Sequence, residues 1–378
     1  MTDIKIVTGA NYGDEGKGLV ANAVGLPTSL YILSSSSCQR AHTVCHNGKR
    51  IVFRHFGSGT IKGAATYFGR KFYINPSMFR LEYEALYREG ITPTVYCHAD
   101  CAMVTPMDMF SNIMKEKVRG SSSHSSTGCG VWETYMRRKR LLLRGENIND
   151  IQTVIDYYKD ELSKIDDPSI PLFLNGDWLK NNVLDDLDFF FNHVVVIHSD
   201  KEERELFHSY SFLVFENGQG LLLDDTYSDD IEHNTPAFVG TIQPMIEIIR
   251  NFDITSEVSI EALYVTRTYY TRHGKGQIGV IEDCEVEKSV INSKMVDNTN
   301  VYNDNQGNLR YGKITADESD MLSKRVHEDI EKLKVLTKMQ SSIVITHTNE
   351  YWNDYLIENA IADNVYLSDN ESTIYLKE

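Results

Sequence analysis

The segment from residue 4 to residue 24 constrains the fold more than any other part of the chain. Ile4–Thr8 is apolar and rich in β-branched residues, which is typical of a buried strand. The turn Gly13-Asp14-Glu15-Gly16-Lys17-Gly18 follows, and Leu19–Val24 has helical character. In such a unit the glycines let backbone N–H groups approach an anion, and the helix N-terminus adds its dipole. The sequence therefore predicts a phosphate-binding loop, with a charged surface turn as the alternative.

This loop departs from the usual pattern G-x-x-x-x-G-K-[ST]. Asn11 stands where the first glycine would fall, and Gly18 replaces the Mg²⁺-binding Ser or Thr. A kinase-like or phosphatase-like P-loop protein would need that hydroxyl, so Gly18 argues against it. Asp14 and Glu15 would repel the phosphates of a nucleotide unless they bind Mg²⁺ or take a proton. The acidic pair therefore indicates chemistry at the loop.

Short apolar runs bounded by polar or glycine-rich residues recur along the chain, and they suit strands of a largely parallel sheet. They are Leu30–Leu33, Val194–Ile197, Phe212–Phe215, Ala262–Thr266 and Ile343–Thr346. Helical patterns lie between them, notably at Ile148–Ile165 and Asp317–Met339. The prediction is an α/β fold with a large, mostly parallel central sheet covered by helices. No Pro- or Gly-rich linker divides the chain, so residues 1–378 are expected to form a single domain.

The charge balance restricts the class of partner. A net charge of −16 argues against nucleic-acid binding, which requires clustered Lys and Arg. The N-terminal residues lack the features of a signal peptide, and no apolar run reaches the ~18 residues of a membrane-spanning helix. Six scattered cysteines suit a reducing compartment. We therefore expect no membrane partner and a cytoplasmic location, in the host cytoplasm if the chain is viral.

Cys97 and Cys101, with His98 between them, form the one cluster that resembles a metal site. No second Cys or His pair stands at zinc-finger spacing. We therefore expect a buried thiol pair at the end of a strand.

Four later segments carry further glycine-rich or polar signatures. They are Arg40-Ala41-His42-Thr43, Ser126-Thr127-Gly128-Cys129-Gly130, Phe215-Glu216-Asn217-Gly218-Gln219-Gly220 and Thr271-Arg272-His273-Gly274-Lys275-Gly276. Together with Val7–Gly18, and in the same order, they resemble the signatures of adenylosuccinate synthetases. In that family His273 corresponds to a valine and Ala41 to a glycine. The resemblance implies an adenylosuccinate-synthetase-like fold and a carbon–nitrogen ligase that joins a 6-oxopurine nucleotide to L-aspartate.

Several details resemble the viral branch of the family more closely. These are the 2-aminoadenylosuccinate synthetases, which act on dGMP in phages that carry diaminopurine DNA. The similar segments are His55–Thr60, Ile74–Pro76, Gly130–Thr134 and Thr299–Gly312. The arginine-rich aspartate-binding loop of ordinary synthetases is missing. Asp14 is retained, however, where many viral members have Ser or Thr, so IMP remains an alternative to dGMP.

The phosphate donor is predicted from a late segment. GTP-specific relatives use a Lys-x-Asp element whose carboxylate pairs with the guanine N1 and N2 donors. Here the corresponding segment is Thr346-His347-Thr348-Asn349, with no carboxylate before Glu350. A neutral amide does not offer the same acceptor pair, which favours ATP or dATP over GTP. A simple loop at a strand end is the alternative interpretation.

The resemblance implies three catalytic residues. Asp14 would act as general base at purine N1, so that O6 accepts the γ-phosphoryl group before aspartate displaces phosphate. His42 would donate a hydrogen bond or proton to the transferring phosphoryl group, and Lys17 would offset its charge. A lone histidine is more often structural, but His42 lies in the His-Thr motif.

The resemblance also implies binding residues for each ligand. For the nucleoside triphosphate they are Gly13, Glu15, Gly16, Lys17, Gly18, Thr43, Thr346 and Asn349. For the purine monophosphate they are Asn11, Gln39, Arg40, Ser126, Thr127, Gln219 and Arg140. For L-aspartate they are Thr299, Asn300, Arg310 and Arg272, where a guanidinium fork suits a carboxylate. The expected cofactor is Mg²⁺, held at Asp14 and Ala41.

A homodimer is implied as well, because in this family an arginine near residue 140 reaches the substrate phosphate of the other subunit. The basic run Arg137-Arg138-Lys139-Arg140 otherwise suggests a solvated helix face. The alternative of another class is a non-catalytic nucleotide-binding module. Such a module would be expected to lose Asp14, Lys17 or His42, and all three are present.

Overall fold

The computed structural model describes residues 1–122, 126–137, 148–175, 177–224, 227, 240–255, 257–279, 284–287, 291, 309–334 and 339–377. Three predicted site residues, Arg140, Thr299 and Asn300, lie outside these ranges.

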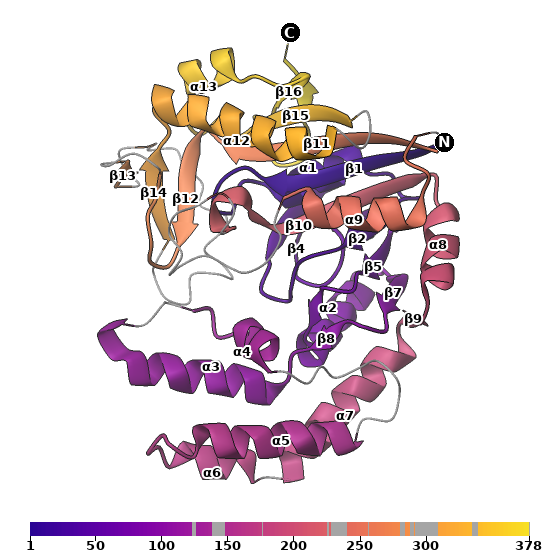
Figure 1. Ribbon diagram of the computed structural model, residues 1–378, viewed down its shortest axis with the longest axis vertical. Helices are drawn as coiled ribbons and strands as arrows, with labels where there is room; N and C mark the ends of the chain where they lie inside the picture. The colour runs from indigo at the N-terminus through magenta and orange to yellow at the C-terminus, as the bar shows by residue number, and fades with distance from the viewer. Residues whose placement is uncertain are drawn as a thin grey trace.

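A ten-stranded sheet forms the centre of the molecule (Figure 1). Its order is β17 (Tyr375–Leu376), β16 (Asn364–Leu367), β15 (Met339–Thr346), β11 (Val258–Arg267), β1 (Thr2–Gly9), β10 (Phe212–Gly220), β2 (Leu30–Leu33), β5 (Ala65–Phe68), β7 (Val95–His98) and β9 (Val195–Ile197). All neighbouring pairs are parallel except β16–β17. The predicted mostly parallel sheet is confirmed.

The central strands of this sheet are apolar on both sides, and both of their faces are buried. Ile6 of β1 belongs to one core cluster, with α8 (Asp200–His208), α9 (Ile242–Asn251), α12 (Ala316–Lys334) and α13 (Asp354–Asn359). The next residue, Val7, belongs to another cluster with α1 (Lys17–Val24). This alternation is the period of two expected of a strand.

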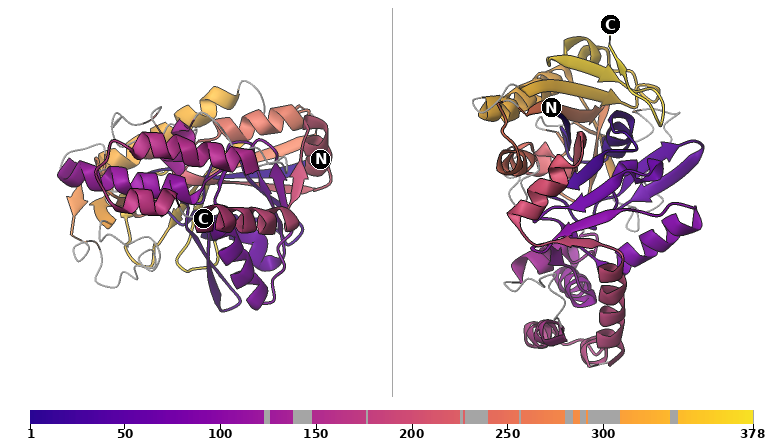
Figure 2. Two further views of the ribbon diagram at one scale, coloured as in Figure 1. Left: turned by 90° about the horizontal axis from the view of Figure 1, so that it is seen from below. Right: turned by 90° about the vertical axis from the view of Figure 1, so that its right-hand side faces the viewer.

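A third core cluster joins β5 and β7 to helices at the far end of the molecule (Figure 2). These helices are α2 (Pro76–Arg88), α3 (Pro106–Arg119), α5 (Ile148–Leu162), α6 (Ser169–Leu174) and α7 (Asp177–Asn192). Helix α4 (Val131–Met136) packs against α3 outside this cluster. Short 3₁₀ turns are η1 (Ser58–Lys62), η2 (Gly120–Ser122) and η3 (Leu221–Leu223). Stacked aromatic rings, such as Phe68 on Phe72, fill this core.

Three small sheets border the large one. The antiparallel hairpin β3 (His42–His46) and β4 (Lys49–Phe53) packs beside α1. A three-stranded antiparallel sheet consists of β12 (Tyr269–His273), β14 (Leu309–Lys313) and β13 (Glu285–Val286). Strands β6 (Tyr73–Ile74) and β8 (Ala102–Met103) form a short parallel pair. The first two of these sheets flank the glycine-rich loop.

The predicted strands and helices are present, but several boundaries differ. The helix predicted over Ile148–Ile165 is α5, which ends at Leu162. The helix predicted over Asp317–Met339 corresponds to α12, which ends at Lys334. Met339 instead opens β15 and pairs with Ile260 of β11. Met339, which the helical pattern had included, therefore belongs to a strand.

Candidate active site

The predicted loop lies at the carboxyl edge of the sheet, between β1 and α1. Strand β1 is flanked by β10 on one side and β11 on the other, so the chain winds outward in both directions from this point. In open α/β sheets such a switch point is where ligands bind. Residues in the carboxyl-terminal parts of β10, β11 and β15, and residues after β2, reach the same edge and supply several of the side chains described below.

Positive backbone φ angles give the loop its shape. Gly13 has φ 125° and Gly16 has φ 94°, values that suit glycine because it lacks a Cβ. Asp14 between them is also left-handed, with φ 57°. A non-glycine residue in this region is strained, so other contacts must hold Asp14 in place.

Glu15 folds back into the loop rather than pointing outward. Its Oε1 accepts hydrogen bonds from the backbone nitrogens of Asn11 (3.2 Å) and Gly13 (2.7 Å). Its Oε2 forms a buried ion pair with Nζ of Lys17 at 2.6 Å. A Cβ at Gly9 would lie 2.7 Å from this carboxylate. Glu15 therefore keeps the loop folded and compensates the charge of Lys17.

Asp14 carries the carboxylate that is best placed for chemistry. Its side chain is 14% exposed, and Oδ2 lies 2.5 Å from Nε2 of His273. Nε of Arg267 donates to its main-chain oxygen at 2.6 Å. Burial opposes ionisation, but His273, Arg267 and Lys17 together lower the pKa of Asp14. The group is therefore an ionised carboxylate at neutral pH.

His42 is held by a buried carboxylate, Glu216 of β10. Nδ1 of His42 hydrogen-bonds Oε1 of Glu216, and Nη1 of Arg40 lies 3.0 Å from the same oxygen. Ser58 adds a backbone N–H (2.9 Å) and a hydroxyl (2.6 Å). Burial opposes ionisation, but these partners lower the pKa of Glu216 to about 2. Glu216 thus fixes the orientation of the imidazole ring.

His42 is neutral in this arrangement. Burial, aided by the charges of Arg40 and Lys17, lowers its pKa to about 4 despite the nearby Glu216. Because an ionised carboxylate only accepts hydrogen bonds, the proton of His42 lies on Nδ1. Nε2 is buried and has no hydrogen-bond partner. A negative phosphoryl group at Nε2 would favour protonation there and allow it to donate.

Other buried polar atoms at this edge also lack partners. Among the described residues they include Oε1 of Gln219 and Oγ of Ser36. A Cβ at Gly218 would lie 2.2 Å from that hydroxyl, so the two segments touch. Since buried polar groups are normally hydrogen-bonded, these atoms indicate a site for a polar ligand.

Several predicted ligand-binding residues are engaged within the protein. The side chain of Asn11 donates to Oγ1 of Thr266 and accepts from Arg325. Besides Glu216, Arg40 donates to the main-chain oxygens of Arg54 and Phe56. These contacts place both side chains in the framework of the loop and of His42.

Gly18 also has a packing role. A Cβ there would lie 2.9 Å from Cβ of His42 and from the main-chain oxygen of Thr43. Strand β3 thus approaches α1 too closely for the Ser or Thr of an ordinary P-loop. Thr43 itself is half-buried at this contact, and Ala41 is half-buried just before it.

The predicted aspartate-binding arginines lie beside the turn after β12. Arg310 donates from Nε to Gly274 O (3.0 Å) and from Nη2 to Gly276 O (2.6 Å), and it pairs with Glu285. Arg272 is buried, and its guanidinium lies 4.7 Å from the ring centre of Tyr12. Arg310 therefore braces the turn.

The remaining monophosphate-binding candidates differ in exposure. Thr127 is exposed and Gln39 is half-buried. Oγ of Ser126 donates to Oδ1 of Asn112 on α3 at 2.8 Å. This bond ties the loop that carries Thr127 to a helix.

Arg137 departs from the interpretation of its basic run as a solvated helix face. Its side chain is buried, and Nε and Nη2 bind both carboxylate oxygens of Asp108 at 2.9 and 2.8 Å. Tyr158 donates to the same carboxylate at 2.6 Å. A guanidinium fixed in this way is not available to a second subunit.

The last residue of β15 contacts the glycine-rich loop, and the residues after it include the predicted base-recognition segment. Oγ1 of Thr346 donates to the main-chain oxygen of Glu15 at 2.6 Å. Asn349 is exposed, whereas Glu350 is buried and accepts from the hydroxyl of Tyr269 at 2.5 Å. The only carboxylate of this segment therefore points into the protein.

Sequence reasoning missed three residues of this site. Glu216 and His273 lie inside the quoted glycine-rich segments, so their position was a usable signal. Arg267 follows the predicted strand Ala262–Thr266 as a lone basic residue, and nothing in its neighbourhood marks it. Its partner, Asp14, is 253 positions away.

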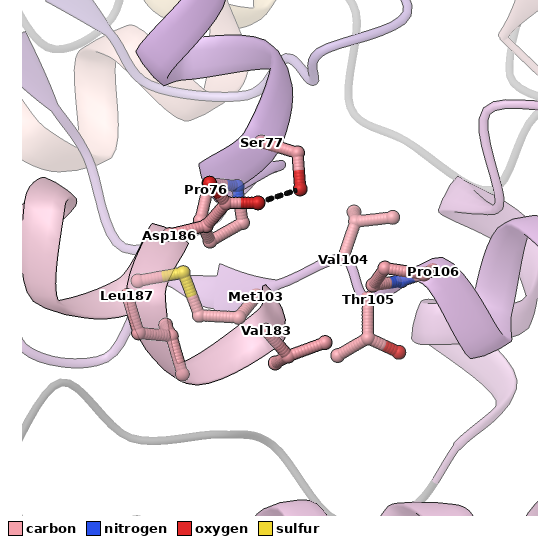
Figure 3. A pocket seen from close by; sticks show the side chains of 9 residues that line it. All are labelled: Pro76, Ser77, Met103, Val104, Thr105, Pro106, Val183, Asp186 and Leu187. Atoms are coloured by element: carbon pink, nitrogen blue, oxygen red, sulfur yellow. Dashed lines mark hydrogen bonds between the residues drawn. The ribbon is translucent and has the colours of Figure 1, made fainter. Parts of the chain in front are cut away.

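A small pocket elsewhere in the described structure contains none of these residues. Figure 3 shows it between the start of α2, the β8–α3 junction and α7, with Ser77 donating to Asp186. Its other lining residues are Pro76, Met103, Val104, Thr105, Pro106, Val183 and Leu187. The lining is mostly apolar and includes no predicted site residue.

The structure also bears on metal and membrane expectations. Cys97 and Cys101 are buried free thiols, and Cys101 donates to Gly69 O at 2.9 Å, so the expected thiol pair is confirmed. Within the described ranges, no group of three or more His, Cys, Asp or Glu side chains is arranged to hold a metal ion. No helix in those ranges is both long and apolar enough to span a membrane.

The fold and this loop define an α/β protein with a glycine-rich loop at the carboxyl edge of a parallel sheet. The family model "Adenylosuccinate synthetase" matches residues 6–347. The chain belongs to the adenylosuccinate synthetase family. It is 21% identical over 276 residues to the adenylosuccinate synthetase of Borrelia turicatae and 22% identical over 291 residues to that of Buchnera aphidicola. Each match covers 72% of this chain and 63% of the relative, so the chain spans under two thirds of their length.

Two solved structures share the fold. The first is the succinoaminodeoxyadenylate synthetase of cyanophage S-2L, bound to dGMP and to dATP as an energy donor. It has a TM-score of 0.67 at 17% identity, covering 100% of this chain and 95% of that one. The second is the fully ligated adenylosuccinate synthetase of Plasmodium falciparum, with a TM-score of 0.65 at 16% identity and coverage of 92% and 77%.

Proposed function

We propose that the protein is a ligase that phosphorylates O6 of dGMP and then joins the purine to L-aspartate, giving 2-amino-2'-deoxyadenylosuccinate. The observation that carries this proposal is a pair of groups at one strand edge. The ionised carboxylate of Asp14 lies in the glycine-rich loop, and the unpartnered Nε2 of His42 lies on the adjacent hairpin. A base and a phosphoryl-contacting group are the two functions that 6-oxo activation requires.

Each catalytic residue has one task in this proposal. Asp14 takes the N1 proton, which raises the electron density on O6 and lets it accept the γ-phosphoryl group. Nε2 of His42 contacts that group, and Lys17 offsets its charge. The amine of L-aspartate then attacks C6, and phosphate leaves with the former O6.

The choice of dGMP rests on overall similarity to the phage enzyme. The solved phage protein, which contains dGMP, matches the chain over nearly the whole length of both. The matches to the cellular relatives cover only 63% of each of them. The retained Asp14 keeps IMP as the second candidate substrate, and the sequence matches to cellular synthetases support it.

ATP or dATP is the proposed phosphate donor. Asn349 is exposed but offers an amide, and Glu350 is buried against Tyr269. Neither group supplies an available carboxylate for the N1 and N2 donors of guanine. GTP belongs to the alternative that uses IMP.

Mg²⁺ is the proposed cofactor. It prefers oxygen ligands and is commonly held by one or two carboxylates together with substrate phosphates. The Asp14 carboxylate is a ligand of this kind, and its lowered pKa keeps it ionised. Asp14 and the main-chain oxygen of Ala41 would hold the ion, which would neutralise charge on the triphosphate.

The remaining assignments complete the proposal. Thr127 and Gln219 would contact the monophosphate nucleotide, and Arg272 would face L-aspartate, with Thr299 and Asn300 beyond the described ranges. The partners are small molecules and a second copy of the chain. Arg140 stays our candidate for the monophosphate. Because Arg137 is bound to Asp108, the contact across the dimer is proposed for another arginine near residue 140.

A substrate matrix tests the proposal. Phosphate release and product formation are measured for dGMP, GMP and IMP against ATP, dATP and GTP, each with and without L-aspartate. We expect turnover with dGMP and an adenine donor, dependent on aspartate. Dominant turnover of IMP with GTP would reject the dGMP assignment. Equal phosphate release with and without L-aspartate, or no release at all, would instead favour the non-catalytic nucleotide-binding module.

A further inference from the structure

The chain segment from the end of β11 through β12 lies along the glycine-rich loop. Alternate residues of an extended chain point to the same side. The alternate residues here are Arg267, Tyr269, Thr271 and His273. Three of them hydrogen-bond Gly13 or Asp14, and Tyr269 hydrogen-bonds Arg267. We call these four residues the β12 clamp.

Three members of the β12 clamp touch the loop directly. Nε of Arg267 donates to the main-chain oxygen of Asp14 at 2.6 Å. Oγ1 of Thr271 donates to the main-chain oxygen of Gly13 at 3.0 Å. Nε2 of His273 lies 2.5 Å from Oδ2 of Asp14 and is the one side-chain contact to that carboxylate within the described residues.

The clamp is itself well supported. The hydroxyl of Tyr269 accepts from Nη1 of Arg267 (2.6 Å) and donates to Glu350 (2.5 Å). His273 pairs with Leu309 of β14. Arg310 on the same strand donates to the main-chain oxygens of Gly274 and Gly276, in the turn after His273. A side chain mounted on a braced strand holds its orientation more closely than one on a free loop.

The loop needs such support. Asp14 has φ 57°, and a non-glycine residue in this region is held there only by its surroundings. With its main-chain oxygen on Arg267, the remaining freedom of Asp14 is rotation of its side chain. The bond to His273 removes that freedom, because it commits Oδ2 and turns Oδ1 away from the imidazole.

We propose that His273 is a positioning residue, which orients the Asp14 carboxylate so that Oδ1 faces the purine N1–H. This inference rests on the proposed function, since it concerns the base of that reaction. The inference adds to the proposed function by naming the residue that orients the Asp14 carboxylate. A general base must lie within hydrogen-bond reach of its proton, and misplacement by about 1 Å costs about 100-fold in rate.

Two substitutions separate orientation from general structural damage. His273→Val removes the donor, whereas His273→Gln keeps an N–H near the position of Nε2. We expect kcat of His273→Val to fall by about 10- to 100-fold with little change in KM for either nucleotide. We expect His273→Gln to recover most of the rate. His327→Val, at an exposed position on α12, is the matched control.

The proposal is overturned if His273→Val turns over at the wild-type rate, or if His273→Gln is as slow as His273→Val. A second measurement does not depend on turnover. In two-bond ¹H–¹⁵N spectra of protein labelled at histidine, Asp14→Asn should shift the His273 resonance and leave that of His327 in place. An unmoved His273 resonance would refute the contact. If wild-type protein turns over no substrate, the proposed function fails, and the spectra still decide whether His273 holds Asp14.

Discussion

Glu216→Gln removes one negative charge from the centre of the site and leaves the shape of the side chain nearly unchanged. Glu216 is fully buried and accepts from Arg40, His42 and twice from Ser58. Glutamine has a single acceptor oxygen, and its NH₂ group would face donors. The substitution therefore leaves the guanidinium of Arg40 buried without its counter-charge.

Two independent routes give the size of the effect. Against the effect of burial, these partners lower the pKa of Glu216 from 4.5 to about 2, a difference worth about 3 kcal/mol of folding stability at neutral pH. Removing one partner of a buried ion pair costs about 3–5 kcal/mol. Arg40 keeps two carbonyl acceptors, which puts the expected loss near the lower limit, at about 3 kcal/mol.

The effect has a defined pH dependence. Because the folded-state pKa of Glu216 lies below its unfolded value, the carboxylate stabilises the protein fully above pH 4.5. This contribution is lost as the pH falls towards 2. At pH 3 somewhat less than half of it should remain.

Thermal unfolding of wild-type protein and Glu216→Gln at pH 7 and pH 3 measures both quantities. With an unfolding entropy of about 2.1 cal/mol/K per residue, a loss of 3 kcal/mol lowers Tm by about 4 °C in a chain of this length. The difference should shrink by about half at pH 3. Equal melting temperatures at pH 7, or a difference that does not change with pH, would refute the reasoning.

Three further perturbations follow from the same geometry. Asp14→Asn should abolish turnover while calorimetry still detects nucleotide binding; near-normal turnover would remove the role of base from this residue. Gly18→Ala should destabilise the protein by about 1–3 kcal/mol in urea unfolding, because β3 leaves no space for a Cβ. Wild-type stability would mean that the hairpin moves aside freely. Arg137→Ala should cost about 3–5 kcal/mol by leaving Asp108 unpaired in the core, and a Tm equal to that of wild type would contradict a buried pair.

The fold was largely predictable because its strands are buried on both faces and read as continuous apolar runs. Strands β5 and β7 did not stand out, since Ala65–Phe68 and Val95–His98 mix apolar residues with Thr and His. Part of their burial comes from helices α5 and α7, which pack over them from later parts of the chain. A local pattern does not contain that information.

The candidate site was predictable in position more than in the roles of its residues. The glycine spacing predicted the loop between the first strand and the first helix. Arg40 and Arg310 were assigned to ligands through the resemblance, and these assignments stay predictions. In the structure their partners are internal: Glu216 lies far along the chain from Arg40, and the backbone after β12 occupies Arg310. Which anion or carbonyl meets a given arginine depends on tertiary contacts, and these leave no local trace.

The place of β1 in the sheet has a consequence for synthesis of the chain. Asp3 pairs with Phe212 and Thr2 pairs with Val258, so both neighbours of β1 lie more than half the chain away. At about 5–20 residues per second, β1 waits roughly 10–40 s on the ribosome before its first partner is made. During that time an apolar strand has two unpaired edges, which is a state prone to aggregation. The loop that follows β1 can take its final shape only after this wait, so catalytic competence would be among the last properties that the nascent protein acquires.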